Sequence, residues 1–458
     1  MKLSVVILAA GLGTRMKSPI PKVAHTIYGK PMIKYVIDAV NDLEADNIII
    51  VLGPHSSSIK DLLKDYPIKF AIQKEPKGTA DALKAGLRQL KNFKGSLLVL
   101  NGDVPLITSD TLRKFLSLHE QNKEDISLIS FIADNPNAYG RVIRNGKAVK
   151  AIIEDNDAYE EQKSIKEVNS GIYAIRHSAL GLLKEIKMNK KKAEYYLTDI
   201  VDIGVRKGYS IGAHLIGDEK EFIGINNRQD LYKASLYLKE RILTYWNERG
   251  ITFMDRSSVY IYPEVKIGEG TLIYPNVYIE GNTSIGKGCL IYPNTRIVDS
   301  EIGDNVVIKD STVIEASKIE DNAVIGPFTH IRPESLIGPS AKIGNFVEIK
   351  KSILGKGVKA SHLSYLGDAE IGEDVNIGAG TITCNYDGKK KHKTIIEAGA
   401  FIGSDSQLIA PVRIGKSAYV GAGTTVTKDV PPFSLAVSRT KQKNIEMWAK
   451  KRQSRGKK

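Results

Sequence analysis

The sequence predicts an α/β domain with a mostly parallel sheet, followed by a parallel β-helix. Two observations predict this division. In roughly the first half of the chain, short β-type runs alternate with amphipathic helical stretches, whereas after Gly250 aliphatic residues return at steps of six. A chain of 458 residues is also too long for one ordinary core, so at least two domains are expected.

The α/β domain is predicted from buried strands that alternate with helices. Because ligands of parallel α/β sheets bind at the carboxyl ends of the strands, the loops that follow these strands are the candidate site. The expected strands are residues 5–8, 48–52, 96–100 and 127–132, and the expected helices include residues 33–43 and 80–90.

A single connecting helix is predicted between the two domains, within residues 227–250. Leu231, Leu238, Ile242 and Tyr245 recur at helical spacing, and Gly250 is suited to cap the end of the helix.

The second domain is predicted from an aliphatic ladder with a period of six residues. This period fits a coil with three short faces per turn, in which one aliphatic side chain per face points inward and glycine often follows it at the corner. Stacked turns then share one continuous core. The period does not determine the handedness of the coil. The ladder consists of Ile261, Ile267, Ile273, Ile279, Ile285, Ile291, Ile297, Ile302, Ile308, Ile314, Ile319, Ile325, Ile331, Ile337, Ile343, Ile349, Ile396, Ile402, Leu408, Ile414, Val420 and Val426.

Two segments depart from this ladder. Residues 359–368 are expected to break it with a histidine, His362. Residues 385–394 (NYDGKKKHKT) are expected to leave the coil as a loop, and such insertions commonly carry function.

The composition excludes several classes of protein. No apolar run approaches the 18–20 residues or so that cross a bilayer, and two cysteines, Cys289 and Cys384, are too few for a disulfide framework. Part of the net charge of +14 comes from a tail, residues 439–458, which has nine basic residues and one acidic residue. No nucleic-acid-binding motif accompanies this charge, so attraction of phosphorylated substrates or a solvated tail explains it better than nucleic acid does.

A glycine-rich turn follows the first predicted strand. Gly11 and Gly13 allow close approach of phosphates, and Arg15 supplies a cation. The glycines alone are also explained by a tight strand–helix turn. The segment extends to Pro21 and Lys22, however, and this longer pattern is typical of sugar-1-phosphate nucleotidyltransferases.

Asp103 ends another predicted strand, within the run Asn101-Gly-Asp-Val-Pro. A carboxylate at this rim suits Mg2+, which prefers oxygen ligands, although a turn or helix-cap aspartate is the alternative.

Together with further segments, these motifs resemble the bifunctional N-acetylglucosamine-1-phosphate uridyltransferase/glucosamine-1-phosphate N-acetyltransferase family. The further segments are Gln73 with residues 78–79, and residues 139–141, 153–154, 169–171, 194–199 and 224–228. The resemblance implies that the first domain is an α/β nucleotidyltransferase (Rossmann-like) fold and that Arg15 and Lys22 neutralise the triphosphate. It implies that Asp103 and Asn226 bind Mg2+. The implied nucleotide and sugar contacts are Leu8, Ala9, Ala10, Gly11, Lys22, Gln73, Gly78, Thr79, Gly140, Glu154, Asn169 and Asn226.

Four residues depart from this family pattern. Lys77 and Asp81 stand where a leucine and a histidine are common, Asn101 where Tyr or Cys is common, and Ser170 where threonine is usual. The departures leave the expected metal site intact and bear on the contacts to the base and the sugar.

The second half resembles the acetyltransferase part of the same family, through residues 330–333, 345–351 and 383–388. The resemblance implies a left-handed parallel β-helix (hexapeptide repeat) and His362 as general base, a role that its ordinary pKa suits. Direct acetyl transfer is expected rather than an acyl-Cys384 intermediate, because nothing in the sequence indicates a base partner for Cys384. The implied sugar-phosphate contacts are Arg332, Lys350, Tyr365, Asn376 and Tyr386, and the implied acetyl-CoA contacts are Ala379, Asn385, Tyr386, Ser404, Ala422 and Arg439.

The resemblance covers nearly the whole chain. It implies a uridyltransferase domain at residues 1–228, a helical linker at 229–250 and an acetyltransferase domain at 251–458. The expected substrates are UTP, acetyl-CoA, glucosamine 1-phosphate and N-acetylglucosamine 1-phosphate, with UDP-N-acetylglucosamine as a product for cell-wall synthesis. A cytoplasmic homotrimer without nucleic acid or stable membrane association is expected. Two alternatives remain: a monofunctional nucleotidyltransferase with a structural β-helix, and a nucleotide-exchange-factor-like binding protein.

Overall fold

The computed structural model describes residues 2–11, 13–54, 56–91, 93–190, 193–438 and 440–455. The chain divides into two compact units, Met1–Leu238 and Lys239–Lys458, each with its own core. None of the helices within these described residues has the length and hydropathy that a bilayer span requires.

The first unit is built on a nine-stranded sheet with the order β11-β7-β10-β6-β1-β4-β5, to which β8 is added beside β10 and β9 beside β8. The strands β4–β1–β6 and β4–β5 pair in parallel, whereas β10 runs antiparallel to both β6 and β7. All four expected strands form. The strands are β1 (Leu3–Ala9), β4 (Asn47–Leu52), β5 (Lys69–Ile72), β6 (Ser96–Asn101), β7 (Ile126–Ile132), β8 (Arg141–Asn145), β9 (Ala148–Ile153), β10 (Glu167–Arg176) and β11 (Ile211–Leu215), with β2 (Thr26–Ile27) and β3 (Lys30–Pro31) as a separate pair.

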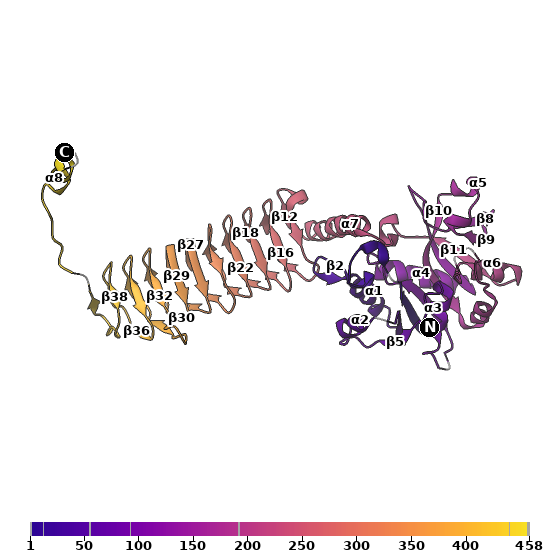
Figure 1. Cartoon of the computed structure of the whole chain (residues 1–458), viewed down its shortest axis with the longest axis horizontal. Coiled ribbons are helices and arrows are strands. Elements are labelled where there is room, and N and C mark those ends of the chain that lie inside the picture. Colours follow the sequence, from indigo (N-terminus) through magenta and orange to yellow (C-terminus); the bar gives the residue numbers. More distant parts are fainter. Residues whose placement is uncertain are drawn as a thin grey trace. The chain divides into compact units, whose positions relative to one another are not determined.

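Helices cover both faces of this sheet (Figure 1). Alternate residues of β1 point to opposite faces, so Val5 and Ile33 share one core cluster while Val6 and Leu83 share another. The predicted α/β fold is therefore confirmed. The helices of this unit are α1 (Met32–Asn41), α2 (Ser57–Leu62), α3 (Thr79–Leu87), α4 (Ser109–Gln121), α5 (Glu160–Lys163) and α6 (Asp199–Arg206).

The connecting helix α7 spans Arg228–Asn247. Gly250 follows with a left-handed backbone (φ 85°), the conformation for which glycine is suited. Beyond Leu238, the buried side of α7 consists of Leu243, with Ile242 and Trp246 packed against the β-helix core. Tyr245, which shares the helical spacing of the apolar residues, is instead 47% exposed.

The second unit is a coil of short parallel strands, visible in Figure 1 as stacked turns from β12 to β38. One sheet has the order β14-β17-β20-β23-β26-β28-β30-β33-β36, and the other two faces join in a second sheet. The strands are β12 (Thr252–Phe253), β13 (Tyr260–Ile261), β14 (Lys266–Ile267), β15 (Leu272–Ile273), β16 (Tyr278–Glu280), β17 (Ser284–Ile285), β18 (Leu290–Ile291), β19 (Arg296–Val298), β20 (Glu301–Ile302), β21 (Val307–Ile308), β22 (Val313–Glu315), β23 (Lys318–Ile319), β24 (Val324–Ile325), β25 (His330–Ile331), β26 (Leu336–Ile337), β27 (Lys342–Lys350), β28 (Ile353–Leu354), β29 (Lys359–Gly367), β30 (Ala369–Ile371), β31 (Asn376–Ile377), β32 (Ile382–Cys384), β33 (Thr394–Ile396), β34 (Phe401–Ile402), β35 (Gln407–Ile409), β36 (Val412–Ile414), β37 (Tyr419–Val420), β38 (Thr425–Val426) and β39 (Leu435–Ala436), followed by helix α8 (Trp448–Arg455).

Every aliphatic residue of the predicted ladder is buried in this coil. The six-residue period of the ladder slips by one residue at some corners, and the turns of the coil are one residue shorter there. Tyr260 pairs with Tyr278, 18 residues on, whereas Ile285 pairs with Ile302, 17 residues on. Asp299 lies at the first slip and has a left-handed backbone (φ 46°), as do Asn276 and Asn294 at corners without a slip. The predicted β-helix is therefore confirmed.

The expectation that His362 breaks the ladder is wrong. Ala360 and Leu366 occupy the inward positions of β29 and are fully buried, while His362 is exposed. The chain turns outward at Leu363, whose backbone is left-handed (φ 43°), so the histidine lies on an outer corner rather than in the core. The expected loop does form, between β32 and β33, with a bridge between Tyr386 and Lys391.

Candidate active sites

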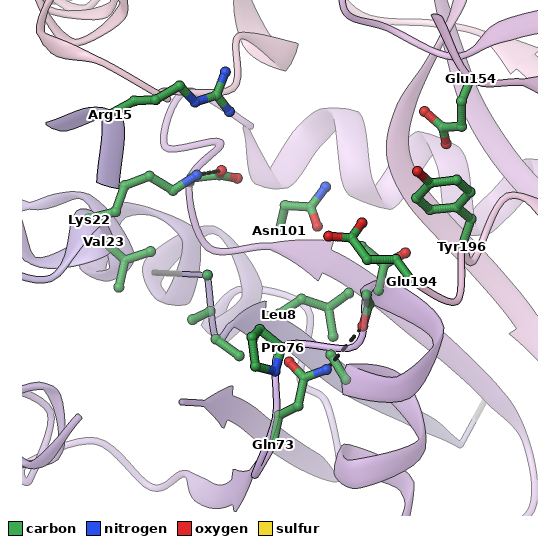
Figure 2. Close-up of a pocket in the computed structure, with 17 residues that line it drawn as sticks. Leu8, Arg15, Lys22, Val23, Gln73, Pro76, Asn101, Glu154, Glu194 and Tyr196 are labelled. Atoms are coloured by element: carbon green, nitrogen blue, oxygen red, sulfur yellow. Dashed lines mark hydrogen bonds and ion pairs between the residues drawn. The ribbon is translucent and has the colours of Figure 1, made fainter. Parts of the chain in front are cut away.

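A cavity of about 510 Å³ lies at the carboxyl ends of β1, β5 and β6 (Figure 2). Strand register places the ends of these strands together, because Leu8 pairs with Asn101 and Ala9 with Leu52. Predicted residues from segments far apart in the sequence line this cavity: Leu8, Ala9, Ala10, Gly11, Arg15, Lys22, Gln73, Gly78, Thr79, Asp103 and Glu154.

A second cavity, of about 230 Å³, shares part of this lining. Leu8, Thr79, Asp103 and Glu154 belong to both cavities, so the two form adjoining parts of one site. The remaining predicted residues of this half line the second cavity: Gly140, Asn169 and Asn226.

Glycine occupies three positions around the first cavity for different physical reasons. Gly13 (φ 63°) and Gly78 (φ 97°) have left-handed backbones, and a Cβ at Gly78 would lie 2.6 Å from the Tyr195 carbonyl oxygen. A Cβ at Gly11 would meet no protein atom within 4 Å. The turn therefore explains Gly13, whereas Gly11 leaves space that a ligand can use.

Cations and oxygen ligands converge at the mouth of this site. The Lys22 Nζ forms an ion pair with the Asp103 carboxylate and donates to the Asn226 Oδ1 over 3.3 Å. Arg15 also donates to the Asn226 Oδ1, over 3.1 Å. Two oxygens from Asp103 and Asn226 thus already face one cation, the Lys22 ammonium. Hard oxygen donors that converge on a positive charge fit Mg2+, which takes few protein ligands and completes its shell with phosphates and water.

Polar side chains with raised pKa values line the second cavity. The Asn169 Nδ2 donates to the Tyr173 hydroxyl over 2.7 Å, and the Thr198 hydroxyl donates to the Glu154 Oε1 over 2.9 Å. Burial raises the pKa of Glu154, and it also raises the pKa of Tyr173. Sequence reasoning assigned no role to Tyr173 or Thr198. Thr198 lies within the segment 194–199 that carries the resemblance, and Tyr173 lies four residues after Asn169, but no local pattern marks either contact because the contacts are tertiary.

The β-helix brings a second group of predicted residues together on its outer surface. Register pairs Asn345 with His362 on adjacent turns, and the His362 Nδ1 lies 3.0 Å from the Asn345 Oδ1. With an acceptor at Nδ1, that nitrogen carries the hydrogen and Nε2 keeps a free lone pair.

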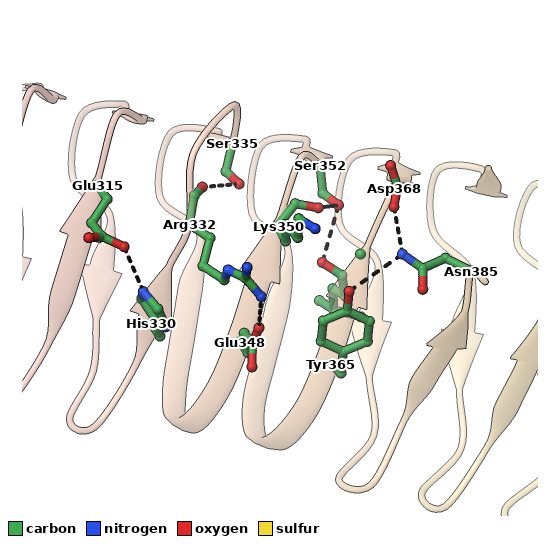
Figure 3. Close-up of polar contacts among 12 residues, drawn as sticks. Glu315, His330, Arg332, Ser335, Glu348, Lys350, Ser352, Tyr365, Asp368 and Asn385 are labelled. Atoms are coloured by element: carbon green, nitrogen blue, oxygen red, sulfur yellow. Dashed lines mark hydrogen bonds and ion pairs between the residues drawn. The ribbon is translucent and has the colours of Figure 1, made fainter. Parts of the chain in front are cut away.

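A cluster of cations surrounds Lys350, one strand from His362. Arg332 donates to Glu348 over 2.7 Å, as Figure 3 shows. The Lys391 side chain, from the loop, lies within hydrogen-bonding reach of Lys350 and lowers the pKa of the Lys350 amine. Cations that repel one another in this way are suited to a shared anion. In the sequence Lys391 is one of five consecutive basic residues, 389–393, a run expected to attract the anionic groups of coenzyme A; its contact with Lys350 is not visible there.

Polar residues next to this cluster form a chain of contacts (Figure 3). The Asn385 Nδ2 donates to the Asp368 Oδ2 over 2.5 Å and to the Tyr365 hydroxyl over 3.4 Å. Asp368 therefore orients Asn385, and Asn385 in turn contacts Tyr365. Asp368 had no assigned role in the sequence analysis.

The expected acetyl-CoA residues follow the corner that bears His362. Backbone N–H groups link successive turns, from Gly380 to the Leu363 carbonyl, from Asp405 to Ala379, and from Gly423 to Ser404. Ala379, Ser404 and Ala422 therefore stack along this corner. Asn376 pairs with Lys359 in β29, Tyr386 is exposed at the start of the loop, and Arg439 lies outside the described residues.

Cys384 is not activated as a nucleophile. Burial raises the pKa of its thiol, and its sulfur has the Ile382 carbonyl as a weak partner at 3.9 Å. A thiolate, not a thiol, is the nucleophilic form.

Comparisons with known proteins agree with this division. Residues 5–167 match the MobA-like NTP transferase domain, residues 256–325 match the GMPPB C-terminal domain, and residues 316–351 and 393–428 match the bacterial transferase hexapeptide repeats. A solved structure of a putative glucose-1-phosphate thymidylyltransferase from Bacillus anthracis is 21% identical with a TM-score of 0.43, covering 51% of this chain and 94% of that chain.

Several relatives are similar to this chain over nearly their whole length. A protein of Thermodesulfovibrio yellowstonii named bifunctional protein GlmU is 53% identical, over 98% of this chain and 99% of the relative. Proteins of the same name from Heliobacterium modesticaldum and Caldanaerobacter subterraneus are each 46% identical, over 96% and 98% of this chain and the same shares of the relatives. The similarity thus spans both groups of site residues.

Proposed function

The chain belongs to the family of bifunctional GlmU proteins, and we propose that each of its two units carries one of the family's two activities. It is a transferase of UDP-N-acetylglucosamine synthesis, with acetyltransferase and uridyltransferase activities. The observation that carries the assignment is the separate convergence of two sets of residues, one around Lys22 and one around His362.

In the uridyltransferase, the sugar phosphate attacks the α-phosphorus of UTP and releases pyrophosphate. Such a reaction depends on positioning and charge neutralisation rather than on a covalent nucleophile. Arg15 and Lys22 face the mouth of the first cavity and would neutralise the triphosphate. Glu154, Asn169 and Gly140 line the adjoining cavity and would hold the sugar.

Asp103 and Asn226 would hold a Mg2+ ion. When bound, the ion would neutralise developing negative charge on the phosphates. Lys22, which now pairs with Asp103, would then be released toward the nucleotide.

In the acetyltransferase, the ammonium group of glucosamine 1-phosphate must lose a proton before its nitrogen can attack the thioester of acetyl-CoA. The His362 Nε2 is free to accept that proton because Nδ1 faces Asn345. The nitrogen then forms a bond to the acetyl carbonyl carbon and the C–S bond breaks. The coenzyme A thiolate takes up the second proton that the nitrogen loses as it becomes an amide, so coenzyme A leaves as its thiol. Arg332, Lys350 and Lys391 would hold the phosphate. Tyr365, Asn376 and Tyr386 would orient the sugar, and the Tyr365 hydroxyl accepts from Asn385. Direct transfer is preferred because Cys384 is not activated.

Ala379, Ser404 and Ala422 would form the acetyl-CoA surface along the corner, with Asn385 and Tyr386 as further contacts. Arg439, which lies outside the described residues, is also proposed to contact acetyl-CoA. A homotrimer is proposed because this site is open on a single chain. His362 is exposed, and Phe328, Phe346 and Leu363 expose 52%, 56% and 61% of their surface at the same corner. A neighbouring subunit would cover these apolar side chains and enclose the site. We place the enzyme in the cytoplasm because UTP and acetyl-CoA are available there.

The test measures both activities in one protein. In the wild type, glucosamine 1-phosphate should release thiol from acetyl-CoA, and N-acetylglucosamine 1-phosphate should release pyrophosphate from UTP. His362→Ala should lose at least about 100-fold in thiol release and keep pyrophosphate release. The matched control is His177→Ala, which replaces an exposed histidine of the first unit and should keep both activities.

The alternatives predict other results. A folded protein with pyrophosphate release and no thiol release would be a monofunctional nucleotidyltransferase with a structural β-helix. A folded protein with neither activity would be a nucleotide-binding protein of the exchange-factor kind. Either result would overturn the proposal.

A further inference from the structure

The amide of Gln73 is held in one orientation by two groups that can only accept hydrogen bonds. Its Nε2 donates to the Asp81 Oδ2 over 2.9 Å and to the Gly78 carbonyl oxygen over 3.1 Å. Both N–H donors of the amide are therefore used. In Figure 2 the dashed line to Gln73 leaves its nitrogen, not its oxygen.

The oxygen of the same amide remains available to a ligand. Gln73 is 5% exposed and lines the first cavity. Within the described parts of the chain, no protein group donates to the Gln73 Oε1. An acceptor that opens onto the cavity can take a hydrogen bond from a ligand N–H when the ligand binds.

The two acceptors also oppose a flip of this amide. Gly78 is held in place because its backbone is left-handed and Tyr195 packs against it, and its carbonyl already accepts from Ala82. A flipped amide would place the Gln73 Oε1 against this carbonyl and the Asp81 carboxylate. It would lose two hydrogen bonds and gain two repulsive contacts.

This orientation discriminates between pyrimidine bases. Uracil carries an N–H at position 3, between two carbonyls, and that N–H can donate to a fixed oxygen. Cytosine carries a lone pair at the same position, so it would need the flipped amide. A site that fixes a hydrogen-bonding group in this way rejects ligands with the opposite pattern.

We propose that Asp81 is a specificity-determining positioning residue, which selects UTP over CTP by fixing the orientation of the Gln73 amide. The inference rests on the proposed uridyltransferase function and assigns a role to a residue that departs from the family pattern. Asp81 touches neither substrate; it acts through Gln73.

The test compares kcat/KM for UTP and for CTP, with N-acetylglucosamine 1-phosphate as acceptor. Asp81→Asn keeps the shape of the side chain, but its amide can donate to a flipped Gln73. The ratio of kcat/KM for UTP to that for CTP should fall about tenfold or more, which is the effect of about one hydrogen bond. KM for UTP should rise more than kcat falls. Asp81→Ala, which removes one acceptor without adding a donor, should lower the same ratio.

The control separates base selection from helix stability. Asp110→Asn removes another aspartate from the first turn of a helix, α4, and should leave the UTP/CTP ratio unchanged. An unchanged ratio in Asp81→Asn, with an active wild type, would overturn the inference. An equal fall in Asp110→Asn would also overturn it, because the effect would then lie in helix stability. A folded wild type without UTP-dependent pyrophosphate release would refute the proposed function instead.

Discussion

Lys22 and Asp103, 81 residues apart in the sequence, form an ion pair at the mouth of the uridyltransferase site. Both side chains are mostly buried, with 13% and 22% of their surface exposed. The pair brings together a residue expected to bind phosphate and one expected to bind metal. Each can therefore be tested through the same activity.

We expect Lys22→Gln to reduce uridyl transfer about 100-fold, because it removes a fixed cation from the triphosphate site. Acetyl transfer should be unchanged, since His362 lies in the other unit. Steady-state pyrophosphate and thiol assays on one preparation check this result. Lys17→Gln, an exposed lysine five residues away, is the control. Uridyl transfer within threefold of the wild type would contradict the assigned role.

Removal of divalent cations should separate the two activities. With a chelator in excess, pyrophosphate release should stop, while thiol release from acetyl-CoA should continue at its usual rate. Asp103→Asn should raise the Mg2+ concentration needed for half-maximal uridyl transfer, because an amide is a weaker ligand than a carboxylate. Titration of Mg2+ with the wild type and with Asp103→Asn measures this shift. Uridyl transfer that needs no divalent cation would exclude the Mg2+ site at Asp103 and Asn226.

We expect Lys391→Ala to raise KM for glucosamine 1-phosphate about tenfold, because one of three cations around the phosphate is lost. KM for acetyl-CoA should change little. Lys389→Ala, from the same loop, is the matched control, since the Lys350 contact belongs to Lys391. Equal effects of the two substitutions would mean that the loop acts through its overall charge.

His119 should make the first unit less stable at acid pH. Its ring is fully buried between Ser96 and Ser127, and burial, followed by the nearby Arg176, lowers its pKa below the usual 6.5. The unfolded chain therefore binds more protons below about pH 6.5, and stability falls as the pH falls. Calorimetry should show a drop in melting temperature between pH 7 and 5.5, and a smaller drop in His119→Gln. A drop of the same size in both would contradict the assignment.

The β-helix offers a test of burial with two neighbouring aliphatic residues. Leu354 is fully buried, whereas Ile353 is 51% exposed, and both belong to β28. Leu354→Ala should destabilise the second unit by about 2–5 kcal/mol, and Ile353→Ala by no more than about 0.5 kcal/mol. Thermal inactivation of acetyl transfer compares them. Equal losses would indicate that Ile353 is buried in the assembled protein.

Local sequence was informative where structure is repetitive. The six-residue ladder predicted the inward residues of the β-helix because each face repeats the same local requirement, one aliphatic side chain and one corner. The segment 359–368 was misjudged for a related reason. His362 is conspicuous in the sequence, but the period assigns the inward positions to Ala360 and Leu366.

The sequence by itself therefore determined the two domain types, the order of the motifs and about half of the residues that line the two cavities. The tertiary structure decided which of these residues meet. The contacts Lys22–Asp103, Asn345–His362, Lys350–Lys391 and Gln73–Asp81 depend on strand register and on the paths of loops. Hydrogen bonds and ion pairs act over a few ångströms, so residues distant in sequence have no local pattern that reveals such a contact.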